Sequence, residues 1–141
     1  MNHLPEYISN HPYIVIATVV AALVGVAFEL RSRALGAAAI ATHAAIALHN
    51  KGALVLDVRT IEEFATGHIV DARNIALEKL AEQAETLKKY REKPVVVVCE
   101  SGARSAQAAK LLKSLGFTQV VNLRGGLSAW RADNLPLTKK A

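Results

Sequence analysis

The chain has 141 residues, of which 17 are Lys or Arg and 12 are Asp or Glu, and it contains one cysteine. This length accommodates one compact domain and a small addition. A single cysteine excludes an internal disulfide framework and a cysteine cluster for zinc or an iron–sulfur centre. The basic residues are interspersed with acids, and aromatic residues make up only 5%. We therefore expect no nucleic-acid partner, because such surfaces combine clustered basic side chains with stacking aromatics.

An N-terminal tail at residues 1–12 is followed by an apolar segment at residues 13–30, in which Glu29 is the only charged residue. At about 1.5 Å per residue, a helix of this length approaches the ~30 Å hydrocarbon thickness of a bilayer. We predict a transmembrane helix that contacts the membrane through residues 13–30. The alternatives are a buried core helix and a cleaved signal peptide. A signal peptide has a basic region before its apolar core, and the tail has no Lys or Arg.

Arg31 and Arg33 follow the apolar segment directly. Because positive flanking residues favour the cytoplasmic side, we expect a single-pass protein of a bacterial inner membrane, with a periplasmic N-terminus and a cytoplasmic C-terminal part. We divide this part into a linker at residues 31–38, a domain at residues 39–138 and a tail at residues 139–141.

Within the domain, short strand patterns alternate with helical ones. The first expected elements are a helix from an N-cap at Thr42 to Gly52, a strand over 53–58, and a short helix that ends at Gly67 and has Thr60 and Glu63 in capping-box spacing. A weak strand over 72–77, an amphipathic helix over 77–90 and a strand over 95–99 follow. The last elements are a helix over 102–116, a strand over 119–123, and a glycine turn with a short helix over 124–136 that holds Trp130. This order favours an α/β fold with a parallel sheet covered on both faces.

The stretch VVVVCESGARS places the only cysteine, Cys99, at the end of the most apolar strand. In parallel sheets, ligands bind at the carboxyl ends of the strands. A turn that contains Gly102 lets backbone N–H groups converge on an anion, and Arg104 adds a cation suited to oxyanions. The same field lowers the pKa of a thiol, although Glu100 opposes this unless it points to solvent. The strand alone would favour an inert core cysteine, and the loop that follows reverses that preference.

Three ordered motifs resemble those of the rhodanese-like sulfurtransferases. They are CESGARS, LDVRTIEEFATGHI at residues 56–69 and GGLSAW at residues 125–130. The resemblance implies a five-stranded parallel sheet flanked by helices, here preceded by one transmembrane helix. It also implies that Cys99 is catalytic, and that the loop residues bind the substrate: Glu100, Ser101, Gly102, Ala103, Arg104 and Ser105. Asp57, Arg59 and Glu63 are then expected to form a supporting salt-bridge network, with His68 as a packed, hydrogen-bonded imidazole.

As an enzyme of this family, the protein would transfer sulfur without a cofactor or a metal. The Cys99 thiolate would attack the outer sulfur of thiosulfate, release sulfite, and keep the sulfur as a persulfide. A thiol or cyanide acceptor would then remove it, and a protein could act as donor or acceptor. His43 and His49 show no convincing metal-ligand geometry.

Two alternatives remain open. One is a membrane-tethered sulfur carrier or interaction module with little turnover of its own. The other is a cysteine-dependent phosphatase of the same fold, which would have five residues between cysteine and arginine, whereas ESGA supplies four.

Overall fold

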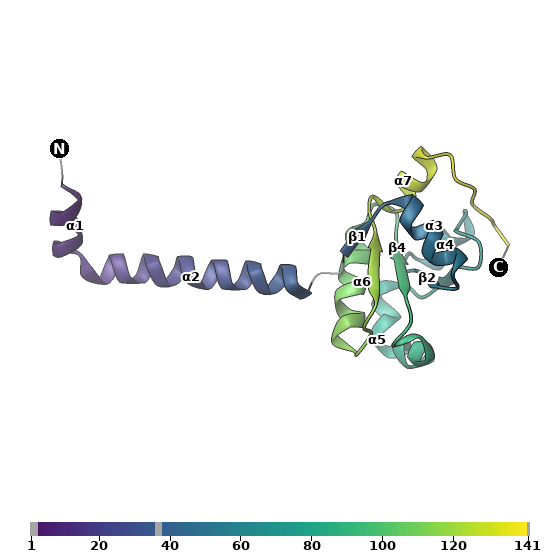
Figure 1. Cartoon of the computed structure of the whole chain (residues 1–141), viewed down its shortest axis with the longest axis horizontal. Coiled ribbons are helices and arrows are strands. Elements are labelled where there is room, and N and C mark those ends of the chain that lie inside the picture. The colour runs from purple at the N-terminus through teal and green to yellow at the C-terminus, as the bar shows by residue number, and fades with distance from the viewer. Residues whose placement is uncertain (1–2, 36–37, 141) are drawn as a thin grey trace. The chain divides into compact units, whose positions relative to one another are not determined.

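The computed structural model describes residues 3–35 and 38–140, which belong to two units, residues 1–35 and 36–141. The first unit contains helix α1 (Leu4–Asn10) and helix α2 (Pro12–Leu35). Figure 1 shows both helices. Pro12 suits the first helical position, where a backbone N–H has no partner within the helix.

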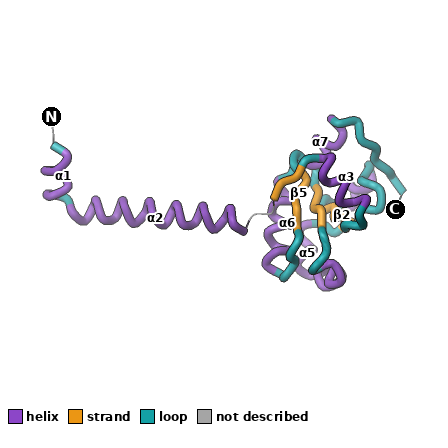
Figure 2. Tube along the Cα trace, in the orientation of Figure 1, coloured by secondary structure: helices purple, strands orange, loops and turns teal. Residues whose placement is uncertain are grey.

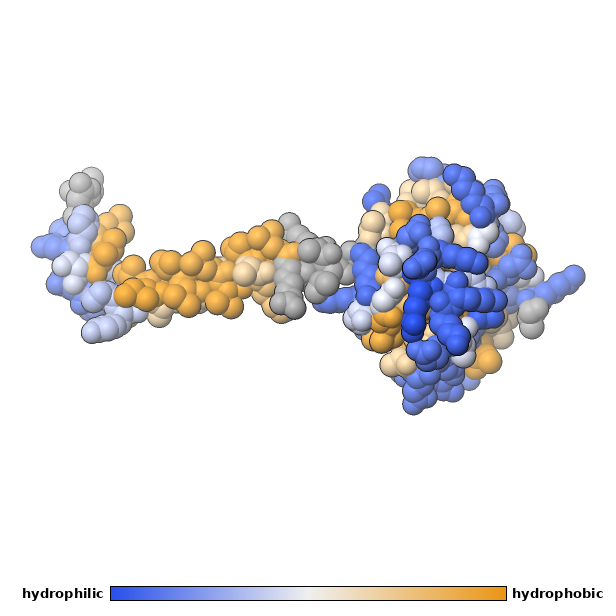
Figure 3. All heavy atoms as spheres, turned by 60° about the horizontal axis from the view of Figure 1, so that its bottom comes forward, coloured by the Kyte–Doolittle hydropathy of each residue, from blue (hydrophilic) through white to orange (hydrophobic). Residues whose placement is uncertain are grey.

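Helix α2 contains the apolar segment found in the sequence. Among the described residues, it is the one helix long and apolar enough to cross a membrane, over Pro12–Leu30, and none of that stretch is buried within the protein. Figure 3 shows its hydrophobic side chains along the helix. The helix continues to Leu35, so residues 31–35 of the predicted linker are helical. The physical reason is that the first helix-breaking residue after the apolar segment is Gly36.

In the second unit, the described residues form five parallel strands in the order β1-β5-β4-β2-β3. Figure 2 shows the strands together in the middle of the domain with helices around them. The strands are β1 (Ala38–Ile40), β2 (Leu54–Asp57), β3 (Arg73–Asn74), β4 (Val95–Val98) and β5 (Val120–Leu123). The helices are α3 (Thr42–Asn50), α4 (Ile61–Ala65), α5 (Leu80–Gln83), α6 (Ala103–Ser114) and α7 (Gly126–Ala132), and two 3-10 helices are η1 (Leu77–Lys79) and η2 (Ala84–Tyr90).

Alternating residues of the central strands face two separate cores. In β4, Val95 and Val97 pack with α5, η2 and α6 on one face, whereas Val96 and Val98 pack with α3 and α7 on the other. Every residue of β2 and β4 is buried, as expected for central strands of a parallel sheet. Both cores are completed by residues of the second unit. The predicted α/β fold with a parallel sheet is therefore confirmed.

Two expected elements differ from the structure, and one strand of the structure was not expected. The segment over 77–90 is not one amphipathic helix but η1, α5 and η2 in succession, and Leu80, Ala84 and Leu87 are its buried residues. Thr42 is the first residue of α3 and not its N-cap, because its hydroxyl donates a hydrogen bond to Asp133. The unexpected strand is β1, which lies at the boundary between the expected linker and the expected domain.

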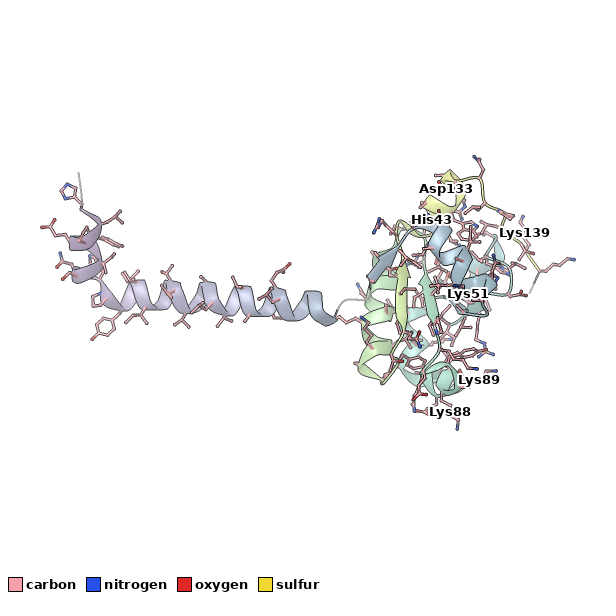
Figure 4. The ribbon with its side chains drawn as sticks, viewed as in Figure 1. His43, Lys51, Lys88, Lys89, Asp133 and Lys139 are labelled. Carbon is pink, nitrogen blue, oxygen red and sulfur yellow. The ribbon has the colours of Figure 1, made fainter. Side chains whose placement is uncertain are left out.

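Basic side chains reach solvent from several segments of the domain. Figure 4 labels Lys51, Lys88, Lys89 and Lys139, which are exposed and extend away from the ribbon. The C-terminal segment is bound to the domain, since His68 and Thr138 exchange two backbone hydrogen bonds of 2.9 and 2.8 Å. Thr138 is the last residue of the expected domain, and in the expected tail the Lys140 carbonyl oxygen lies 2.7 Å from His68 Nε2, so the contact with the domain extends into the tail.

Candidate active site

Cys99 follows the buried strand β4 at the carboxyl edge of the sheet. The β2–β4 register pairs Asp57 with Val98, so Val58 and Cys99 leave the sheet at the same edge. The Cys99 side chain is completely buried. The strand therefore places the sulfur atom where ligands bind in parallel sheets.

The loop after Cys99 folds back so that its amides point at the sulfur. The N–H groups of Gly102 and Ser105 donate to Sγ over 3.0 and 3.3 Å. Gly102 has a φ of +101°, a backbone conformation that favours glycine. These contacts place the sulfur at the N-terminus of α6, where backbone donors and the helix dipole favour negative charge.

These contacts also change the acidity of the thiol. Burial raises the pKa of Cys99, but hydrogen bonds to the Ser105 hydroxyl and to the N–H groups of Ser105, Gly102 and Ser101 outweigh it, so that the pKa lies below its ordinary value. A lowered pKa increases the thiolate fraction at neutral pH, and the thiolate is the nucleophilic form of cysteine. The lowered pKa that we predicted for the Cys99 thiol thus arises from its hydrogen bonds to the loop.

Asn122, which no sequence motif indicated as a site residue, orients Ser105. The Ser105 hydroxyl lies 2.5 Å from Asn122 Oδ1 and 3.3 Å from Cys99 Sγ. Asn122 Nδ2 also donates to the Gly102 carbonyl over 3.3 Å. The signal in the sequence is a buried amide within the otherwise apolar strand VVNL, because buried polar side chains require partners.

The GGLSAW motif contacts the backbone of the loop that follows Cys99. The N–H groups of Leu127 and Ser128, in the first turn of α7, donate to the carbonyls of Cys99 and Glu100 over 2.9 and 3.0 Å. A Cβ atom at Gly126 would lie 2.4 Å from the Cys99 carbonyl oxygen, a distance that no side chain tolerates. Glycine is therefore required here for the close approach of two backbones.

Arg104, which we predicted as a cation for oxyanions, is paired with a carboxylate of the protein itself. Its Nη1 and Nη2 donate to the Glu63 carboxylate over 2.8 and 3.0 Å. Glu63 is fixed by the predicted capping box, in which its carboxylate accepts from the Thr60 N–H over 2.9 Å. The Arg104 guanidinium and then the Thr60 N–H lower the pKa of Glu63 to about 2. Glu63 thus belongs to an ion pair at the loop, separate from Asp57 and Arg59.

The Glu63–Arg104 pair predicts a pH-dependent contribution to stability. A lowered folded-state pKa stabilises the fold above the ordinary value of 4.5, and this stabilisation disappears as the pH falls toward about 2. Glu63→Gln keeps an acceptor for the capping box. Wild type should therefore exceed Glu63→Gln in free energy of unfolding by about 1 kcal/mol or less above pH 4.5, and the difference should vanish in acid. Urea unfolding at a series of pH values measures this, and a difference that stays constant with pH would contradict it.

Asp57 and Arg59 form the buried pair beneath the loop. Arg59 is 1% exposed, and its Nη2 donates to Asp57 over 2.8 Å and to the Gly67 carbonyl over 2.7 Å. Arg59 Nη1 also lies 3.6 Å from the carboxylate of Glu100. Glu100 does not point freely to solvent, because Arg131 of α7 donates to its other oxygen.

His68 is a buried, packed imidazole, as we predicted from the sequence. Its ring stacks on Phe64 with a centroid distance of 3.7 Å, and its Nδ1 and Nε2 lie 2.9 and 2.7 Å from the Phe64 and Lys140 carbonyl oxygens. Ser101 and Ala103 are exposed on the loop. In the part of the chain that the structure describes, no group of three or more His, Cys, Asp or Glu side chains is placed to hold a metal ion.

The chain is similar to a known protein family, to bacterial proteins and to solved structures. Residues 41–133 match the model of the rhodanese-like domain. The uncharacterized protein YibN of Escherichia coli is 30% identical over 99% of both chains. The thiosulfate sulfurtransferase GlpE of Pseudomonas savastanoi is 37% identical over 61% of this chain and 79% of its own. The crystal structure of a rhodanese-related protein from Thermoplasma volcanium, 32% identical, matches 73% of this chain and 99% of its own with a TM-score of 0.65.

Proposed function

The chain belongs to the rhodanese-like domain family, and from this premise we propose that it is a sulfurtransferase that carries sulfur as a persulfide on Cys99. The observation that carries the proposal is the position of Sγ, which receives the N–H groups of Gly102 and Ser105. The same donors would stabilise a thiolate before the reaction and a charged persulfide after it.

The proposed first half-reaction needs only the thiolate and a sulfane-sulfur donor. With thiosulfate, Cys99 Sγ bonds to the outer sulfur, the bond between the two thiosulfate sulfurs breaks, and sulfite leaves with the electron pair. In the second half-reaction, cyanide or a thiol attacks the outer sulfur of the persulfide, and Cys99 leaves as thiolate. Thiosulfate is proposed as a donor because GlpE, a relative, is named for it.

Intact-mass measurement of the full-length protein in detergent tests this function. Incubation with thiosulfate should add one sulfur atom, and subsequent cyanide should remove it and yield thiocyanate. A protein whose mass never changes, with thiosulfate or with any other sulfane-sulfur donor, would refute the proposal. Sulfur addition without turnover to small acceptors would instead indicate a carrier that delivers sulfur to a protein.

The apolar helix α2 is proposed to anchor this domain to a bacterial inner membrane. Arg31 and Arg33 follow the apolar stretch Pro12–Leu30, whereas no Lys or Arg precedes it. This asymmetry favours a cytoplasmic domain and a periplasmic N-terminus.

Reporter fusions in a bacterial host measure this topology. Green fluorescent protein fused after Ala141 should be fluorescent in the membrane fraction, and alkaline phosphatase at the same position should be inactive, because it needs the oxidising periplasm for its disulfides. Substituting Arg31 and Arg33 with Asn should weaken the orientation. Active phosphatase at the C-terminus of the unaltered chain, or a chain cleaved near residue 30, would show that the anchor proposal is wrong.

A further inference from the structure

The positive charge of Arg104, the arginine of the CESGARS motif, is neutralised by a carboxylate. Both Nη atoms of Arg104 donate to the two oxygens of Glu63, and these side chains are 34% and 38% exposed. An anion that approaches the loop therefore meets an ion pair. The guanidinium keeps other N–H donors, but its charge is offset by a carboxylate fixed on α4.

The carboxylate of Glu100 offsets the positive charge of further arginines near the loop. Glu100, the residue directly after the cysteine, contacts Arg131 through one oxygen and lies 3.6 Å from Arg59 through the other. Arg59 in turn is already paired with Asp57. Each of these arginines thus faces a carboxylate, and none supplies a surplus positive charge.

The backbone donors of the loop are also engaged. The N–H groups of Gly102 and Ser105 point at Cys99 Sγ itself. When Cys99 ionises, they stabilise its own charge, and the ion pairs around the loop contribute no net charge. The reactive site is then negative, and a donor with two negative charges is repelled at the distance of reaction.

On the basis of the proposed function, we propose that Glu63 and Glu100 determine which sulfur donor reacts with Cys99. The site favours a persulfide of a small thiol, which carries at most one negative charge, over thiosulfate, which carries two. In this step Cys99 Sγ bonds to the terminal sulfur of R–S–SH and the bond between the two donor sulfurs breaks. The electron pair leaves on RS⁻, and the proton stays on the Cys99 persulfide. No external oxidant or reductant is consumed.

The test compares the rates at which Cys99 takes up one sulfur atom from 2-mercaptoethanol persulfide and from thiosulfate. It uses quenched samples of the full-length protein in detergent and intact-mass detection. The variants are Glu63→Gln and Glu100→Gln, which remove charge and keep shape. Glu85→Gln is the matched control, because Glu85 pairs with Arg91 over 2.8 Å outside the loop. Rates are measured at several ionic strengths.

Wild type should take sulfur faster from the persulfide. Each loop variant should accelerate uptake from thiosulfate about tenfold, as expected when a charge-assisted hydrogen bond becomes available, and change uptake from the persulfide much less. Only the loop variants should lose thiosulfate rate as salt screens the freed arginine. Faster uptake from thiosulfate by wild type, or an unchanged donor ratio in both variants, would overturn this inference while the proposed function stands. Uptake from neither donor would overturn the proposed function itself.

Discussion

Full-length protein with Cys99→Ser should take up no sulfur from a sulfane-sulfur donor, a loss of roughly a thousandfold or more, as expected when a covalent nucleophile is removed. The hydroxyl of serine is almost fully protonated at neutral pH, whereas hydrogen bonds lower the pKa of the Cys99 thiol. The chain has no second cysteine, so the sulfur has no other thiol to occupy. Intact mass after donor exposure and thiocyanate release measure both half-reactions.

The fold should survive this substitution. The serine oxygen would take the place of a buried sulfur that receives the N–H groups of Gly102 and Ser105, so the cost is about 1 kcal/mol. Ser114→Ala, at the exposed end of α6, is the control for a change of one side-chain atom. A folded Cys99→Ser protein that transfers sulfur as fast as wild type would show that the persulfide mechanism is wrong.

Local signals in the sequence predict much of this structure because the corresponding interactions are local. Thr60 and Glu63 are three residues apart, and their capping box forms as expected. The apolar run before Cys99 predicts a buried strand, and the small residues after it predict a tight loop. Such interactions depend on backbone geometry that a few neighbouring residues set.

The partners of the charged residues could not be predicted in this way. Glu63 and Arg104 are 41 positions apart, and Glu100 and Arg131 are 31 apart. Their pairing depends on how α4, α6 and α7 meet at the edge of the sheet. The sequence showed which charges exist near the loop, but only the fold shows that carboxylates offset the arginines there.

The same distinction explains the errors in secondary structure. The apolar spacing over 77–90 is compatible with α-helical and 3-10 turns, which differ in how tightly they wind. The short strand AAI has only one β-branched residue and forms because β5 offers its edge, with Ala38 beside Val121. Tertiary pairing decides such segments more than propensity does.

Arg59→Met should destabilise the full-length protein by about 3–5 kcal/mol, because it leaves the carboxylate of Asp57 buried without its cation. Arg59 and Asp57 are 1% and 0% exposed, and three side-chain hydrogen bonds of 2.8–3.1 Å join them. Such a loss is a large fraction of the stability of an ordinary domain. Urea unfolding, followed by the fluorescence of the single tryptophan, Trp130, measures it.

Two further variants make this result interpretable even where Arg59→Met fails to fold. The double variant Asp57→Asn with Arg59→Met removes both charges and should recover part of the loss, because the buried carboxylate is gone. Glu85→Gln breaks an exposed pair whose side chains are 75% and 41% exposed and should cost less than about 1 kcal/mol. A cost for Arg59→Met no greater than that of Glu85→Gln, or a double variant less stable than the single one, would contradict a buried ion pair as the support beneath the Cys99 loop.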